Sequence, residues 1–248
     1  IVLVRDVTEL RRRDRQLVSK DATIREIHHR VKNNLQTISS LLRLQARRLK
    51  GDEAKAALGE SVRRIGAISV VHETLAQSAE DDVAFSEIVR PLVRVVEESV
   101  SSPLRPLAFT VTGDAGVLPG QVTTTMAVVL TELLQNAVDH AFPSGAGVAD
   151  EDSRDGPLPA GQVRIDLDRR PDGLSVRVVD DGVGLPEGFD LAEATGLGLT
   201  IVRTFVEGEL GGRIRLLPVE GGSGTMAEVW VPAARLVGPW GDANEPTT

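Results

Sequence analysis

The sequence contains no cysteine, and no stretch of it is long and apolar enough to cross a membrane. Without cysteine the chain can form neither disulfide bonds nor thiolate metal sites, and it suits a reducing compartment. A membrane-spanning helix needs roughly 20 consecutive apolar residues, and no signal peptide opens the sequence. We therefore expect a soluble, cytoplasmic chain with no membrane segment.

Basic residues are also in deficit. The chain has 28 Lys and Arg against 36 Asp and Glu, which gives a formal net charge of −8. A general nucleic-acid binder needs a basic surplus to displace counterions from the phosphate backbone. We therefore expect no nucleic-acid partner. Hydrophobic residues make up 41% of the 248 residues, enough for two modest domains with cores of their own.

The first third of the chain predicts a helical hairpin. Residues 8–49 contain neither glycine nor proline, and apolar residues recur every seven positions at Leu10, Leu17, Ile24, Val31 and Ile38. This spacing predicts one long helix, and a second amphipathic run over 53–77 predicts an antiparallel partner. Because a hairpin exposes its own apolar stripe, we expect two copies to pair into a four-helix bundle, which makes the protein a homodimer.

After the acidic residues 80–82 the pattern changes to mixed helix and strand. We expect helices over 86–100, 121–141 and 197–209, a strand over 107–112, and two strand hairpins, 163–168 with 174–180 and 213–218 with 225–231. Three helices against an antiparallel-rich sheet make an α/β sandwich. The fold class is therefore α+β multidomain, a long helical hairpin followed by an α/β sandwich. Residues 144–162, rich in Gly, Pro, Ser and Asp, predict a flexible insertion, and 238–248 predict a similar tail.

Polar residues line one face of the predicted helix over 121–141. Glu132, Asn136 and His140 are four residues apart and therefore share a face. A carboxylate, an amide oxygen and an imidazole in one row suit a Mg²⁺–phosphate complex, because Mg²⁺ prefers hard oxygen ligands and keeps several waters. The same pattern also fits the polar side of an ordinary amphipathic helix.

Three short glycine-containing motifs follow, at 180–184, 195–199 and 222–225. In the first, Asp180 ends a predicted strand, where a carboxylate can accept a hydrogen bond from an exocyclic amine and the glycines allow a close backbone approach. The second opens a helix whose free N–H groups can bind phosphate. Each motif alone also fits an ordinary turn.

In this order and spacing, the four segments resemble the N, G1, G2 and glycine-threonine boxes of the GHKL ATPase fold, which histidine kinases share with gyrase, Hsp90 and MutL. The resemblance covers about 84–232, and we place the ATP-binding domain at 80–237. It implies ATP and Mg²⁺ as cofactors, with Asn136 as a Mg²⁺ ligand, Asp180 reading the adenine amine and Glu132 helping to activate the reacting groups. The remaining nucleotide-binding residues that it implies are His140, Gly182, Gly184, Gly196, Gly198, Gly224 and Thr225.

Two positions depart from the family's first box. Thr131 stands where the box usually begins with Asn, and Asp139 stands where a lysine that reaches phosphate is common. These departures concern the phosphate contacts rather than ATP itself. The lid between the glycine boxes, about 185–195, is short and holds Phe189 alone in place of a phenylalanine-rich segment, which suits a compact kinase.

Residues 26–36 resemble the acceptor box of histidine kinases with an H-R-x-K-N signature. Helical geometry separates the two neighbouring histidines. At about 100° per residue, His28 lies about 50° from the centre of the apolar stripe and His29 about 150° away. His29 therefore faces solvent, and we identify it as the phosphoacceptor. Glu26 and Asn33 share its face, so a carboxylate can orient the ring or take its proton while an amide holds the other nitrogen.

The family resemblance also implies a relay. We assign 18–79 to dimerisation and histidine phosphotransfer, and expect the phosphoryl group to pass on to an aspartate in the receiver domain of a response regulator. Residues 1–9 resemble the last strand and exit motif of a PAS sensor domain, so we assign 1–17 to the end of such a domain and a signalling helix. The chain begins with Ile1, and we expect part of the sensor to precede it.

Three other functions share parts of this pattern. An ATP-driven clamp of the chaperone or mismatch-repair type uses the same ATPase fold, but the acceptor box argues against it. An adaptor that has lost kinase activity is disfavoured by the retained Asn136, Asp180 and glycines. A serine kinase of the anti-sigma type needs neither the helical hairpin nor His29.

Overall fold

The computed structural model describes residues 8–77, 82–100, 107–142, 161–194 and 196–237. The chain divides into two compact units, residues 1–81 and 82–248. The expected strand at the N-terminus and the tail lie outside the described residues. So does the expected insertion except for its last two residues, Gly161 and Gln162, which already belong to a strand.

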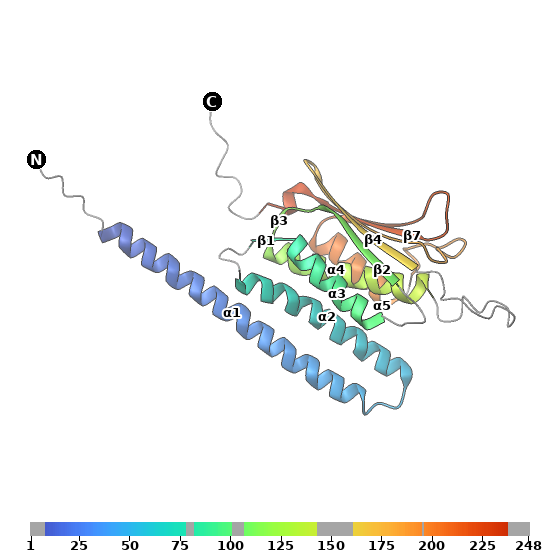
Figure 1. Ribbon diagram of the computed structural model, residues 1–248, viewed down its shortest axis with the longest axis horizontal. Helices are drawn as coiled ribbons and strands as arrows, with labels where there is room; N and C mark the ends of the chain where they lie inside the picture. Colours follow the sequence, from blue (N-terminus) through green and yellow to red (C-terminus); the bar gives the residue numbers. More distant parts are fainter. Residues whose placement is uncertain (1–7, 78–81, 101–106, 143–160, 195, 238–248) are drawn as a thin grey trace, which may run out of the picture. The chain divides into compact units, whose positions relative to one another are not determined.

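The first unit is a hairpin of two long antiparallel helices (Figure 1), α1 (Thr8–Ala46) and α2 (Asp52–Gln77). The first helix ends three residues earlier than the sequence pattern predicts. Arg48 donates its backbone N–H to Gln45 and Leu49 donates to Ala46, so the last turn tightens to i→i−3 bonding and the chain leaves the helix.

The side of α1 that faces α2 carries Val31, Leu35 and Leu42, all half-buried. Ile38, which we expected in the same stripe, is 45% exposed. A seven-residue repeat on a straight helix drifts by about 20° per repeat, so Ile38, one repeat after Val31, lies further from α2. Two further exposed apolar side chains of α1 lie away from α2, Ile27 and Leu41.

The second unit is an α/β sandwich. Its elements are, in order, β1 (Asp82–Ala84), α3 (Ser86–Val100), β2 (Leu107–Asp114), β3 (Val117–Pro119), α4 (Gly120–Asn136), the π-helix η1 (Ala137–Ala141), β4 (Gly161–Arg170), β5 (Gly173–Asp180), α5 (Leu197–Arg203), the π-helix η2 (Thr204–Glu209), β6 (Arg213–Pro218), β7 (Thr225–Pro232) and the 3-10 turn η3 (Ala233–Arg235).

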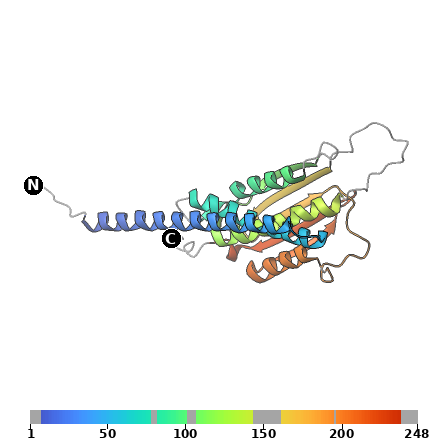
Figure 2. The ribbon, with the colours of Figure 1, turned by 90° about the horizontal axis from the view of Figure 1, so that it is seen from below.

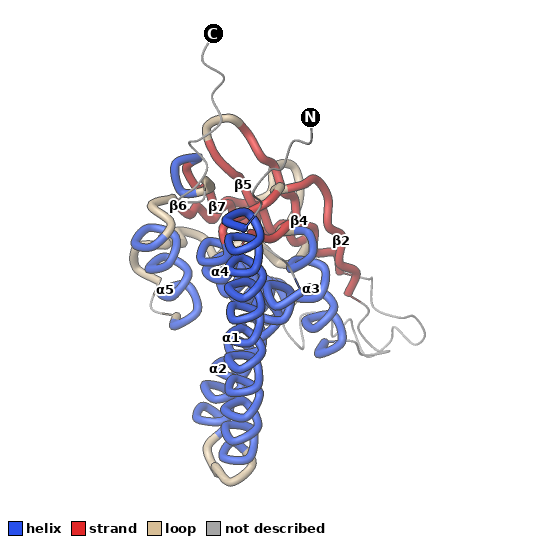
Figure 3. The backbone as a smooth tube through the Cα atoms, turned by 90° about the vertical axis from the view of Figure 1, so that its left-hand side faces the viewer, coloured by secondary structure: helices blue, strands red, loops and turns tan. Residues whose placement is uncertain are grey.

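Five strands form the main sheet in the order β2-β4-β5-β7-β6. Both expected hairpins are present, with Val163 opposite Asp180 in one and Ile214 opposite Val229 in the other. The pairing of β2 with β4 is parallel, and α4 lies in the crossover between them. Helices α3, α4 and α5 lie side by side on one face of the sheet, with α4 in the middle (Figures 2 and 3).

The two faces of the sheet follow from strict alternation along its strands. Inward-facing residues of the central strands are buried: Val163, Ile165, Leu167, Leu174, Val176, Val178, Ala227, Val229 and Val231. The opposite face is polar and carries ion pairs along and between strands, such as Arg215 with Glu228 and Arg170 with Asp168. The core therefore lies between the sheet and the three helices.

The structure differs from the sequence prediction at two helix ends. The helices expected over 121–141 and 197–209 both finish in π-helical turns, η1 and η2. In the second, Leu210 donates its N–H to Phe205, five residues back. Hydrophobic periodicity does not distinguish such wider turns from an α-helix. A π-turn nevertheless changes the direction in which the following side chains point. The two-stranded pairing of β1 with β3 was also missed, because three-residue strands carry too little pattern.

Candidate active site

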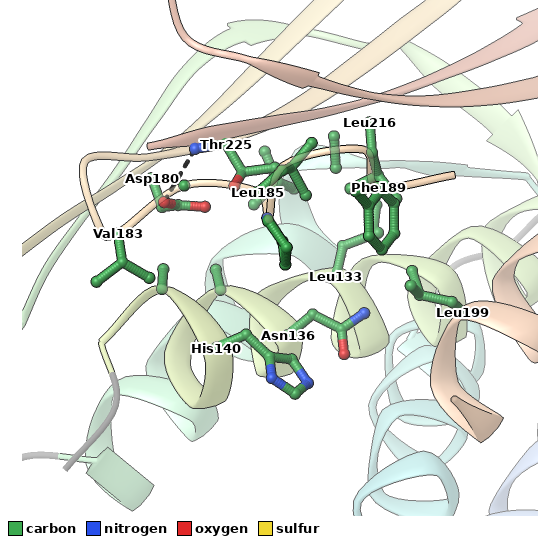
Figure 4. A pocket seen from close by; sticks show the side chains of 16 residues that line it. Leu133, Asn136, His140, Asp180, Val183, Leu185, Phe189, Leu199, Leu216 and Thr225 are labelled. Atoms are coloured by element: carbon green, nitrogen blue, oxygen red, sulfur yellow. Dashed lines mark hydrogen bonds between the residues drawn. The ribbon is translucent and has the colours of Figure 1, made fainter. Parts of the chain in front are cut away.

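A cavity of about 320 Å³ opens between α4, the sheet and the segment after β5 (Figure 4). Its lining residues are Leu133, Asn136, Ala137, His140, Ala141, Val178, Asp180, Val183, Gly184, Leu185, Pro186, Phe189, Leu199, Leu216, Thr225 and Ala227. Most of these are apolar, and a few polar groups converge at defined points, which is the usual construction of a small-molecule site.

Asp180 is the buried carboxylate of this cavity. It continues the inward row of β5 after Val176 and Val178, so the alternation of the strand places it between sheet and helices. Its Oδ1 accepts two backbone N–H bonds, from Gly182 at 3.0 Å and from Thr225 at 3.1 Å. Burial raises the pKa of this carboxyl, and the two N–H bonds oppose the rise. Both bonds end on Oδ1, so they orient the carboxylate while Oδ2 keeps its capacity to accept from a ligand.

The glycines beside Asp180 allow the chain to pass very close to it. Gly224 has φ +123°, and a Cβ there would lie 2.0 Å from the carbonyl oxygen of Asp180. A Cβ on Gly182 would lie 2.2 Å from the carbonyl oxygen of Ala141, which accepts the N–H of Val183 at 3.0 Å. These two positions therefore require glycine, and they fix the segment after β5 against the end of η1.

Asn136 and His140 form the helical side of the cavity (Figure 4). Asn136 is half-buried, and its Nδ2 is a buried atom with no hydrogen-bond partner among the described residues. His140 sits in the π-turn η1 and is exposed at the cavity mouth. A buried amide without a protein partner at a cavity wall is expected where a ligand completes the bonding.

Glu132 lies one turn before Asn136 and is buried, but it is not part of the cavity lining. Its Oε2 lies 2.9 Å, and Asn136 Oδ1 lies 3.6 Å, from the position that a Cβ on Gly198 would take. A carboxylate oxygen and an amide oxygen therefore meet beside the first turn of α5. Two hard oxygens in this arrangement fit Mg²⁺, which accepts a few protein ligands together with phosphate oxygens and water.

The other predicted nucleotide-binding residues differ in whether they line the cavity. Gly184, with φ +80°, and Thr225 line the cavity, whereas Gly196 and Gly198 do not. Gly196 precedes α5, and its carbonyl oxygen accepts the N–H of Thr200 at 3.0 Å. The α-helical part that follows has seven residues before the chain widens into η2.

The segment that resembles the acceptor box, residues 26–36, lies on α1, in the other unit. His29 is exposed, as the helical geometry predicts, and Asn33 is exposed as well. The carboxylate of Glu26 accepts a hydrogen bond from Arg30 Nε at 2.7 Å, so Glu26 is engaged by a cation beside His29. On the side toward α2, His28 meets His72, and Lys32 forms an ion pair with Glu73. The sequence pattern did not single out His72 or Glu73, although both lie in the predicted second helix.

A cavity with a buried carboxylate, glycine-dependent close approaches and a polar helix face, on a mixed sheet covered by three helices, defines a nucleotide-binding domain of the GHKL ATPase type. The comparisons agree. Residues 121–235 match the family described as histidine kinase-, DNA gyrase B- and HSP90-like ATPase, and residues 26–100 match the family described as histidine kinase. The chain belongs to the sensor histidine kinases.

Curated relatives support this family. The chain is 47% identical over 213 residues to the sensor histidine kinase PdtaS of Mycobacterium tuberculosis (strain ATCC 25618 / H37Rv), covering 86% of this chain and 40% of that protein. It is 46% identical over 234 residues to PdtaS of Mycolicibacterium smegmatis, covering 94% of this chain and 44% of that protein. The chain therefore spans less than half the length of these relatives.

One solved structure has the same fold across both units. It is the histidine kinase domain of the blue-light activated histidine kinase EL346 from Erythrobacter litoralis, with a TM-score of 0.59, 24% identity, and coverage of 89% of this chain and 95% of that chain. Separately, no helix in the described part of the chain has the length and apolar character needed to span a membrane.

Proposed function

We propose that this chain is the catalytic part of a histidine autokinase that transfers the γ-phosphoryl group of ATP to His29. The observation that carries the proposal is the joint presence, in one chain, of the Asp180 cavity and an exposed histidine on the first helix of the hairpin. A GHKL machine that only clamps has no use for such a histidine.

ATP fits the cavity by its chemistry. The oriented Asp180 carboxylate can accept a hydrogen bond from the exocyclic amine of adenine, and the apolar walls formed by Val178, Leu133 and Ala227 suit the faces of a planar base. We propose Mg²⁺ as the partner of the phosphates, held by Asn136 Oδ1 with Glu132 beside it. When bound, Mg²⁺ supplies charge neutralisation during phosphoryl transfer.

His29 supplies the nucleophile. A neutral imidazole nitrogen attacks the γ-phosphorus, the bond to the β–γ bridging oxygen breaks, ADP leaves, and the second ring nitrogen loses its proton. Glu26 is placed three residues before His29 and can take that proton once its bond to Arg30 exchanges. Asn33, four residues after His29, can hold the ring.

The experiment is autophosphorylation with γ-labelled ATP and Mg²⁺, comparing His29→Gln and Asn136→Ala with the unchanged protein. We expect label that survives alkali and is lost in acid, and its absence in both variants. Binding of a fluorescent ATP analogue should persist in His29→Gln and fall in Asn136→Ala. Full labelling of His29→Gln would remove His29 as the acceptor while leaving the ATP site intact.

We also propose that two chains pair through their hairpins. Along α1, at about 100° per residue, the exposed Ile27, Ile38 and Leu41 fall on one stripe, about 90° from the side that faces α2. Their exposed fractions are 52%, 45% and 58%, high for large apolar side chains in a row. A second copy covers this stripe with identical chemistry, and His29, on roughly the opposite side of α1, stays accessible.

Three further parts of the proposal rest on the sequence rather than on the structure: the first on the family resemblance, the second on residues 1–9, and the third on the absence of cysteine. The phosphoryl group on His29 passes to an aspartate in the receiver domain of a response regulator, a sensor domain of the PAS type supplies the signal upstream, and the protein works in the cytoplasm. Transfer of label from the phosphorylated chain to a purified receiver domain tests the first of these.

A further inference from the structure

His28, the neighbour of His29 in the sequence, contacts His72 between the two helices of the hairpin. The Nδ1 atoms of His28 and His72 lie 2.9 Å apart, and the ring centroids are 5.2 Å apart with 38° between the ring planes. This is a hydrogen-bond distance. A neutral imidazole has one N–H and one bare nitrogen, so one ring donates to the other. Both side chains are half-buried.

The pair is well placed to control the rotation of α1. His28 is bonded through the backbone to His29, and on a helix the two side chains are held about 100° apart. If His28 is fixed against α2, His29 must point away from α2. One turn further on, the ion pair between Lys32 and Glu73 holds the same two helices together.

We propose that His28 and His72 are positioning residues for His29: their hydrogen bond holds α1 in the rotation that presents His29, and protonation of both rings releases it. This inference rests on the proposed role of His29 as acceptor. It gives the hairpin an acid-sensitive contact that does not involve the His29 side chain.

The release follows from proton counting. When both rings are protonated no acceptor nitrogen remains, and two cations face each other at 2.9 Å. Burial, and then the positive charge of His28, lower the pKa of His72 below 6.5. Among the side chains that the structure describes, Lys32 on α1 and Glu73 on α2 lie beside the pair and form an ion pair with each other. On the outer side of α1, Glu26 pairs with Arg30.

Two substitutions separate hydrogen bonding from titration. In His72→Asn an amide nitrogen stands near the position of Nδ1 and still donates, but it does not titrate. His72→Leu keeps apolar bulk and removes the bond. At neutral pH we expect His72→Leu to autophosphorylate about tenfold more slowly, because a misplaced nucleophile loses rate steeply, with an unchanged KM for ATP. His72→Asn should recover most of this rate.

The pH profile provides the readout that a merely structural role would not change. As pH falls, the rate of the unchanged protein should decrease more steeply than that of His72→Asn, because only the unchanged protein has a second ring whose protonation breaks the contact. Glu73→Gln is the matched control, because it removes the neighbouring ion pair and leaves both rings. Its profile should keep the shape of the unchanged protein.

Nitrogen NMR observes the pair directly, since the chain has only four histidines. With ¹⁵N-histidine labelling, and His29→Gln and His140→Gln for assignment, we expect the two remaining rings to titrate as a coupled pair, the second proton binding at lower pH than the first. Independent titration of the two rings, or a His72→Leu variant with the rate and profile of the unchanged protein, would overturn the proposal. If His72→Leu does not fold, His72→Asn and the titration still decide. Full labelling of His29→Gln would instead refute the acceptor assignment, without altering the NMR result.

Discussion

The backbone N–H of Thr225 donates to Oδ1 of Asp180 at 3.1 Å, across 45 residues of sequence. This bond joins the end of β5 to the start of the neighbouring strand β7, next to the close contact that requires glycine at position 224. The carboxylate of Asp180 is therefore oriented by a strand that follows it in the chain.

Asp180→Asn tests the reading of adenine. The amide can keep one oxygen as an acceptor for the two N–H groups, but its NH₂ then faces the exocyclic amine and the acceptor is lost. Removing a buried hydrogen bond to a charged group should weaken ATP binding by about 10- to 100-fold, measured by calorimetry. Asp181→Asn is the control: this exposed neighbour bonds the backbone of Gln162 instead, and its ATP affinity should stay close to that of the unchanged protein.

The raised pKa of Asp180 makes ATP affinity depend on pH. Burial is the main cause of the rise. The carboxylate must be ionised to accept from the amine, so affinity should fall as pH decreases through the raised value, at a pH above that of an ordinary aspartate. Calorimetric titrations over a pH series should show this fall, and Asp180→Asn should show a flatter dependence over the same range. Equal slopes would contradict the assignment.

The raised pKa of Asp180 has opposite pH effects on ATP affinity and on the stability of the ligand-free fold. Between the unfolded and the raised folded pKa, the folded protein binds more protons than the unfolded chain, so the stability that Asp180 contributes falls as pH rises through that window. At neutral pH the buried charge is a cost without ATP. We therefore expect ligand-free Asp180→Asn to melt no lower than the unchanged protein at neutral pH, although it binds ATP worse. A clear drop in its Tm would show that the charge itself stabilises the fold.

Gly224→Ala should damage both fold and site. The backbone has φ +123°, and the new Cβ would lie 2.0 Å from the carbonyl oxygen of Asp180, so β7 must shift away from β5. We expect a loss of about 1–3 kcal/mol in unfolding free energy, together with weaker ATP binding. Gly222→Ala, in the same turn, is the matched control. Nothing lies within 4 Å of its Cβ position, so chemical denaturation should show little change in its unfolding free energy.

Ile38→Glu tests pairing of the hairpins. A charge in the centre of the exposed stripe must be desolvated in the proposed dimer, so light scattering should show a shift from twice the monomer mass toward the monomer mass. Gln36→Glu changes an exposed position outside the stripe by a similar charge and should leave the mass unchanged. A dimer that persists in Ile38→Glu would mean that another surface joins the two chains.

The sequence predicted the elements whose patterns are long and strict. The Gly- and Pro-free run gave α1 to within a few residues, and the alternation of β4 and β5 gave their hairpin and the inward position of Asp180. The parallel pairing of β2 with β4 and the π-turn under His140 were not predictable, because they depend on backbone geometry set by distant packing. The ring-to-ring bond of His28 with His72 joins residues 44 apart, and no local pattern in either helix signals it.

Because Thr225 orients Asp180, the cavity can be completed only late in the synthesis of the chain. Residues 8–77 of the hairpin leave the ribosome before any of the sheet, and the cavity is incomplete until β7 has emerged. A truncated product that stops before residue 225 would therefore carry His29, the proposed acceptor, without a complete cavity. Mixed with full-length chains that lack His29, such a fragment would be labelled only by its partner, and complementation of this kind would reveal whether the phosphoryl group crosses between chains.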